Sequence, residues 1–125
     1  MSKRNEPLPR MRDLCLALPE VTERLSHGAP TWFVRDKKTF VTFVDDHHGD
    51  GIVGIWCAAP AGVQEALVAE EPARFFRPPY VGGRGWLGVR LDVEVDWDEM
   101  AGIVEDAYRC VAPKKLVALL PSPAA

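Results

Sequence analysis

The chain has 125 residues, of which 47% are apolar and 26% charged, and its formal net charge is −3 at pH 7. This length and composition predict one globular domain over residues 1–125, with a core that needs neither disulfides nor metals to fold. The slightly acidic balance excludes a protein that coats nucleic acid non-specifically, because such proteins are basic overall.

The first predicted element is an amphipathic helix that begins near Pro9 and ends before Pro19. Its apolar residues recur at helical spacing and are Met11, Leu14, Cys15 and Leu18. Residues 18–23 are interpreted as a link to the next element. The ends of the chain, residues 1–7 and 121–125, are expected to be flexible.

Three strands follow the link. Residues 25–30 combine Gly and Pro and are interpreted as a turn or a short extended segment. Residues 31–35 are β-branched and aromatic, and residues 39–44 alternate, so the two predict an antiparallel hairpin with a polar turn at 36–38. Residues 52–57 are apolar throughout, which is typical of a strand in the middle of a sheet.

The second half alternates helices and strands. Pro60 marks a helix start, and the apolar Phe75 and Phe76 are expected to anchor the next segment in the core. Residues 86–91 predict a strand in which Gly88 marks a bulge or close packing. Asp96 is expected to cap a long helix, and residues 114–120 a last short one.

The predicted order is α-β-β-β-α-β-α-α. Consecutive strands joined by short turns indicate an antiparallel sheet. We therefore expect an α+β two-layer sandwich, in which a sheet of about four to six strands carries its helices on one face.

The cysteines and the hydropathy bear on the compartment. Cys15, Cys57 and Cys110 are odd in number, far apart in sequence and surrounded by apolar residues, so buried thiols are expected. The N-terminus lacks the apolar run of a signal peptide, and no window approaches the ~20 apolar residues that span a membrane. A cytoplasmic protein without a membrane partner is predicted.

The strongest functional signal is a cluster of arginines between residues 72 and 91. Four arginines occur there without an acidic residue, although the rest of the chain carries eighteen Asp and Glu. Arg77, Arg84 and Arg90 can pair with phosphates, and the neighbouring Tyr80 and Trp86 can stack on bases. The alternative is that these arginines lie over core aromatics and are simply solvated.

A second basic cluster lies at the predicted hairpin tip and comprises Arg35, Lys37 and Lys38. A basic hairpin can contact phosphates from one side. Together the two clusters predict a nucleic-acid-binding module, with DNA as the expected partner. Lysine is also the usual residue at exposed hairpin tips and strand edges, which is the structural alternative.

A different class of function is a small-molecule site, with or without catalysis. It would use a pocket between the sheet and the aromatic loop, lined by His27, Trp32, Tyr80 and Trp86. The sequence contains no nucleophile elbow, catalytic triad order, paired catalytic carboxylates or dinucleotide fingerprint, which favours a binding module over an enzyme. Neither a cofactor nor a metal is predicted, and the polar residues 45–51 are interpreted as a hairpin loop.

Several segments of this sequence resemble segments of the MmcQ/YjbR-like family. The segment from His27 to Phe33 is similar to the family's HGxPxF entry. Phe76, Pro78, Tyr80 and the strand from Trp86 are similar to its F-x-P-x-Y…W segment, and residues 96–111 to its C-terminal helix. The resemblance covers residues 9–120. It implies a frataxin/CyaY-like α+β fold and a DNA-binding role through two protruding wings.

Two positions depart from the family pattern. Trp56 stands where the family's third strand often carries a lysine, which removes a candidate phosphate contact, and Ala107 replaces the serine of a Ser-Tyr pair. The iron-binding role of frataxins does not carry over, because the first predicted helix bears Arg10 and Arg12 beside a single acid, Asp13.

Overall fold

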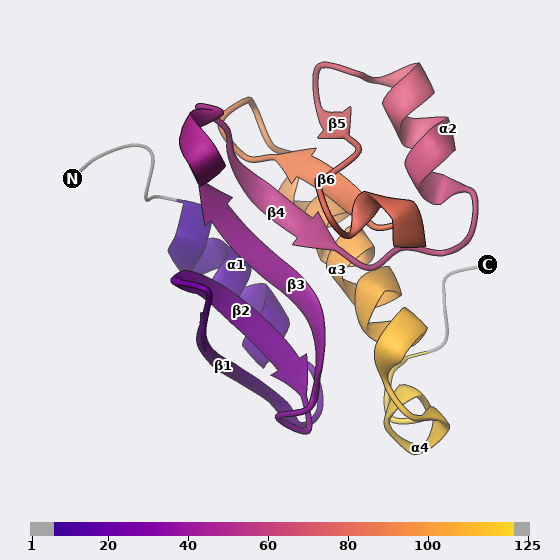
Figure 1. Cartoon of the computed structure of the whole chain (residues 1–125). Helices are drawn as coiled ribbons and strands as arrows, with labels where there is room; N and C mark the ends of the chain where they lie inside the picture. Colours follow the sequence, from indigo (N-terminus) through magenta and orange to yellow (C-terminus); the bar gives the residue numbers. More distant parts are fainter. Residues whose placement is uncertain (1–6, 122–125) are drawn as a thin grey trace.

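The computed structural model describes residues 7–121 (Figure 1). The elements in chain order are α1 (Pro7–Leu16), β1 (Val21–Ser26), β2 (Ala29–Val34), β3 (Lys38–Asp45), a 3₁₀ turn (His47–Gly49), β4 (Val53–Cys57), α2 (Val63–Glu70), β5 (Phe75–Phe76), a second 3₁₀ turn (Gly82–Arg84), β6 (Leu87–Arg90), α3 (Trp97–Val111) and α4 (Lys114–Val117).

The strands form one antiparallel sheet in the order β1-β2-β3-β4-β6-β5. Successive strands from β1 to β4 are neighbours, so short turns suffice to connect them. All five residues of β4 are buried, as expected of a strand in the middle of the sheet. The α+β class and the antiparallel sheet predicted from the sequence are confirmed.

The helices α1 and α3 cover one face of the sheet (Figure 1). Trp32, Phe40 and Tyr108 are fully buried in this layer, with the rings of Phe40 and Tyr108 edge-to-face at 5.7 Å. The Tyr108 hydroxyl donates a 2.8 Å hydrogen bond to the carbonyl of Pro19, which ties α3 to the segment that follows α1. Neither α1 nor α3 covers the opposite face of the sheet, which we call the open face; α2 contacts β5 and β6 at one end of the sheet.

The interpretation of residues 18–23 as a link was wrong, because Val21–Ser26 forms the edge strand β1. Its polar sequence lacks the apolar alternation of a half-buried strand, and none of its residues is fully buried. The turn that follows, His27-Gly28, takes positive φ values of 52° and 79° and joins β1 to β2 as a two-residue hairpin.

Three other local expectations changed. The second helix begins at Val63 rather than Pro60, and its buried residue is Gln64 rather than an apolar one. Cys110 is exposed, whereas Cys15 and Cys57 are buried as expected. Pro7 begins α1 and is buried, so it does not belong to a flexible end; the remaining terminal residues assigned to flexible ends, apart from Pro121, lie outside the described range.

Two local predictions are confirmed, one about a glycine and one about a helix cap. A Cβ added to Gly88 would lie 2.4 Å from the ring of Phe76, so this glycine permits close packing of β5 on β6. The Asp96 carboxylate accepts hydrogen bonds from the backbone N–H groups of Asp98 and Glu99 and caps α3.

Acid should destabilise the fold through Glu23, which links α1 to the sheet. Arg12 donates to both Glu23 carboxylate oxygens at 2.8 and 3.0 Å, and the Trp32 indole N–H donates at 2.9 Å; these bonds lower the pKa of Glu23. The bond from Arg90 likewise lowers the pKa of Asp92. A carboxyl group whose pKa is lower in the folded state stabilises the fold at pH values above its unfolded-state pKa of about 4. This stabilisation is lost as the pH falls through the folded-state pKa.

We therefore expect the urea midpoint to fall as the pH drops below about 4. Glu23→Gln should lower stability at neutral pH and flatten this acid slope, leaving the part due to Asp92. An acid slope in Glu23→Gln as steep as in the wild type would contradict the assignment.

Candidate functional site

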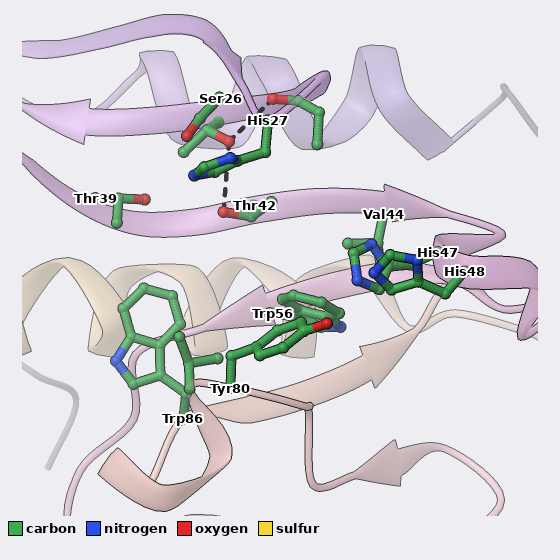
Figure 2. Close-up of a pocket in the computed structure, with 13 residues that line it drawn as sticks. Ser26, His27, Thr39, Thr42, Val44, His47, His48, Trp56, Tyr80 and Trp86 are labelled. Carbon is green, nitrogen blue, oxygen red and sulfur yellow. Dashed lines mark hydrogen bonds between the residues drawn. The ribbon is translucent and has the colours of Figure 1, made fainter.

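A pocket of about 650 Å³ lies on the open face (Figure 2). One wall is the β1–β2 hairpin, the opposite wall is the segment of residues 77–86, which we call the β5–β6 loop, and β3 and β4 form the floor. The volume lies within the ~300–1,000 Å³ typical of ligand sites.

The hairpin wall carries polar side chains. Ser26, His27 and Thr31 line it, and Figure 2 shows the His27 side chain extending from the turn toward β3. The Thr31 hydroxyl lies 3.0 Å from the carbonyl of Ala29, to which it donates, and 3.4 Å from the hydroxyl of Thr42 on the floor. This wall therefore offers hydroxyl and imidazole groups.

The opposite wall is held in place by Gln64. This side chain is buried in α2, and its amide nitrogen donates to the backbone carbonyls of Gly82 and Trp86. The Arg77 side chain packs against Gly82, where an added Cβ would lie 2.7 Å from the Arg77 Cγ atom. These contacts fix the loop that presents Tyr80 and Trp86 to the pocket.

An aromatic cluster forms one end of the pocket. The His47 ring lies 4.9 Å from Trp56 and 6.0 Å from Tyr80, and the centroids of Trp56 and Tyr80 are 6.4 Å apart (Figure 2). Tyr80 is 76% exposed and has a positive φ of 64°, which is unusual for a bulky residue. His48 also lines the pocket, stacked edge-on against His47.

Three polar atoms in this pocket are buried without a hydrogen-bond partner in the described part of the chain. They are the Thr39 hydroxyl oxygen, the His47 Nε2 atom and the Trp56 Nε1 atom. Buried polar atoms are nearly always hydrogen-bonded in native proteins. Their grouping in one pocket makes this pocket the candidate functional site.

The predicted cations divide into two groups. Arg35 is paired with Glu20 at 3.2 Å, and Arg90 donates two hydrogen bonds to Asp92 at 2.9 and 2.8 Å. The Asp92 carboxylate raises the pKa of Arg90. Because their charge is offset locally, these two arginines are weaker candidates for phosphate contacts than sequence alone indicated.

The second group is Lys37, Lys38, Arg77 and Arg84, for which residues 7–121 contain no ion pair with a carboxylate. Lys38 and Arg84, from the hairpin tip and the β5–β6 loop, line one depression of about 390 Å³. Thr39, Trp86 and Val111, the last residue of α3, complete its lining. The Arg84 guanidinium lies 5.1 Å from the centre of the Trp86 ring. The fold thus brings together one cation from each predicted basic cluster.

Trp32 does not belong to the pocket. It is fully buried and points to the helical face, where its indole N–H bonds Glu23. Alternation along β2 explains this, since Thr31 faces the pocket and the next side chain must face the other way. His27, Tyr80 and Trp86, the other three predicted pocket residues, do line it.

The chain's three histidines, His27, His47 and His48, all line the pocket. Across residues 7–121, no group of three or more His, Cys, Asp or Glu side chains is placed to hold a metal ion.

Burial raises the pKa of the Cys57 thiol to about 12, so this thiol stays protonated at neutral pH and is a poor nucleophile. Among the helices of residues 7–121, none is both long and apolar enough to cross a bilayer.

A family model described as YjbR matches residues 16–110. The chain belongs to the YjbR family. The resemblance inferred from His27–Phe33, the β5–β6 loop and α3 is thereby confirmed.

The fold of this YjbR-family chain is similar to the crystal structure of Deinococcus radiodurans protein DR2400, described as a DUF419 domain. The TM-score is 0.71 at 15% sequence identity, over 92% of this chain and 85% of that one. The comparison with curated proteins found no match. At this identity the likeness shows the shared fold.

Sequence reasoning missed several pocket residues of this YjbR-family chain. Thr31, Thr39 and Thr42 were assigned to strands without a functional role, and Trp56 was interpreted only as a lost phosphate contact. Thr39 and Thr42 stand out in the sequence as polar residues in an otherwise apolar strand. That pattern was the available signal for a solvent-facing site on the open face.

Proposed function

We propose that the open face binds nucleic acid, with phosphates contacted by Lys37, Lys38, Arg77 and Arg84. The observation that carries the proposal is the depression shared by Lys38 and Arg84, two cations from segments far apart in sequence. Arginine and lysine without carboxylate partners are available to phosphate oxygens, and Trp86 beside them offers an aromatic surface.

The test is fluorescence anisotropy with labelled DNA over a salt series. For four neutralised phosphates, log K should fall with log salt at a slope of about −3 to −4 on duplex DNA. Lys38→Ala/Arg84→Ala should reduce the magnitude of this slope by about 1.8, because two phosphate contacts are removed.

The matched control is Arg10→Ala/Arg109→Ala, which removes the same charge from helices α1 and α3. It should leave the slope close to the wild-type value. Equal effects of the two double variants would mean that net charge, not the open face, determines binding. Absence of binding at micromolar protein in low salt would refute the proposal.

A second candidate is a small anionic ligand held in the pocket itself, with His27, Tyr80 and Trp86 as lining residues. The enclosed volume of about 650 Å³ favours it. A ligand that binds only the folded state stabilises it by about 2.7 kcal/mol at a hundredfold excess over Kd. A thermal-shift screen with anionic metabolites tests it, and shifts without any binding of DNA would favour this candidate.

We also propose a cytoplasmic location. The support is chemical: Cys15, Cys57 and Cys110 are free thiols, which a reducing compartment preserves.

A further inference from the structure

The unpartnered polar atoms of the pocket differ in what they require from a ligand. The Trp56 indole N–H can only donate, the Thr39 hydroxyl can donate and accept, and an imidazole nitrogen such as Nε2 of His47 does one or the other. Trp56 is only 8% exposed, so bulk water cannot supply its partner. A matching ligand carries both acceptors and donors.

The aromatic side chains around these atoms favour a flat ring. Trp56, Tyr80 and His47 contact one another at ring separations of 4.9 to 6.4 Å. Figure 2 shows the Tyr80 ring next to Trp56, and the planes of the two rings are tilted by 56°. A planar heteroaromatic ring would stack on the exposed Tyr80 side chain and turn its polar edge toward the unpartnered atoms. An inorganic anion would leave the aromatic surfaces unused, and a purely apolar ligand would leave the polar atoms unpaired.

The cations lie next to this ring site. Thr39 and Trp86 line both the pocket and the depression that contains Lys38 and Arg84, so the two spaces adjoin. A ligand that spans them has a heteroaromatic ring joined to an anionic group. A nucleotide has this arrangement.

We propose that the pocket receives one unpaired base of a nucleic-acid strand, stacked against Tyr80, while a phosphate of the same strand lies at Lys38 and Arg84. This inference rests on the proposed nucleic-acid binding and names the form of nucleic acid that the open face selects. A base inside a duplex has its polar edge paired and both faces stacked, so it cannot enter the pocket. The face therefore prefers single strands, or duplexes with an extruded base.

The test compares three labelled probes at one salt concentration: oligodeoxythymidylate, an abasic phosphodiester of the same length, and a blunt duplex. The abasic probe keeps the phosphates and removes the rings. Loss of one stacked base should weaken binding by about 5- to 150-fold. The blunt duplex should bind about as weakly as the abasic strand.

Two substitutions assign the effect to the pocket. Tyr80→Ala should weaken binding of oligodeoxythymidylate and leave binding of the abasic strand unchanged, and Tyr80→Phe should keep the wild-type preference because the ring remains. Thr39→Val should weaken only the base-dependent part while the melting temperature stays the same or rises, since it removes an unpartnered buried hydroxyl. Leu16→Ala, at an exposed apolar position in α1, is the control.

The outcomes separate the two proposals. If none of the three probes binds, the proposed function fails and this inference with it. If intact and abasic strands bind equally, or Tyr80→Ala weakens both alike, the base pocket is refuted and phosphate binding stands. If thymidine monophosphate binds as tightly as the oligonucleotide, the ligand is a free nucleotide and the strand is refuted as its source.

Discussion

Replacing Gly54 with alanine is expected to cost about 3 kcal/mol or more of folding stability, and to lower the melting temperature by about 10 °C. Gly54 lies in β4 between Val44 of β3 and Arg90 of β6. A Cβ at this position would lie 2.4 Å from the backbone carbonyl oxygen of Val89. A backbone carbonyl in a paired strand cannot turn aside, so relief requires separation of β4 from β6.

Gly88→Ala is the matched control for this prediction. The added Cβ would be just as close to its neighbour, at 2.4 Å, but that neighbour is the half-buried side chain of Phe76. The ring can rotate away, so we expect a loss of only about 1 kcal/mol. Equilibrium unfolding in urea measures both variants. If Gly54→Ala were as stable as Gly88→Ala, β4 and β6 would have to separate at a lower cost in free energy than their geometry indicates.

Gln64→Glu is expected to destabilise the protein by about 3 kcal/mol or more at pH 7. The glutamine amide donates to the carbonyls of Gly82 and Trp86 from a buried position. An ionised carboxylate has no proton to donate and would face two carbonyl oxygens. Burial and these oxygens favour the neutral acid, so the introduced group has a folded-state pKa above its unfolded value of about 4.3.

The sign of the pH dependence follows from that raised pKa. The defect should be smallest below about pH 4.3, build up as the pH rises toward the folded-state pKa, and level off above it. Gln64→Leu, which cannot ionise, should be destabilised by an amount that does not vary with pH. The measurement is the difference in urea midpoint from the wild type at each pH. Parallel pH profiles for the two variants would contradict the proposed contacts.

Because Gln64 fixes the β5–β6 loop, both variants should also bind oligodeoxythymidylate more weakly than the wild type. Anisotropy below the melting temperature separates this effect from unfolding. Unchanged affinity in folded Gln64→Leu would show that the loop keeps its place without the amide.

The apolar helices and strands of this chain were predictable because the spacing of their apolar residues indicates which side chains are buried. Residues 39–44 and 52–57, and the helix capped by Asp96, lie where the sequence indicated. The edge strand β1 was not predictable from apolar alternation, because it is stabilised by pairing with β2 and by polar contacts such as Arg12–Glu23. Those contacts join residues that only the folded chain brings together.

The candidate site was predictable in composition and not in arrangement. The basic clusters were recognised, but the sequence could not show that Arg35 and Arg90 pair with Glu20 and Asp92. Nor could it show that Lys38 would lie beside Arg84. Ion pairs and shared depressions depend on distances across the sheet, which local patterns do not encode.

The arrangement of the helical layer has a consequence during synthesis. Every strand precedes α3 in the chain, yet α3 covers the face of the sheet that carries Phe40 and Trp32. Until residues 97–111 have left the ribosome, a nascent chain has strands whose apolar side can pack only against α1. The sheet can therefore complete its packing only late in translation. A pause in translation before α3 lengthens the time during which chaperones or neighbouring chains can bind the exposed apolar face of the sheet.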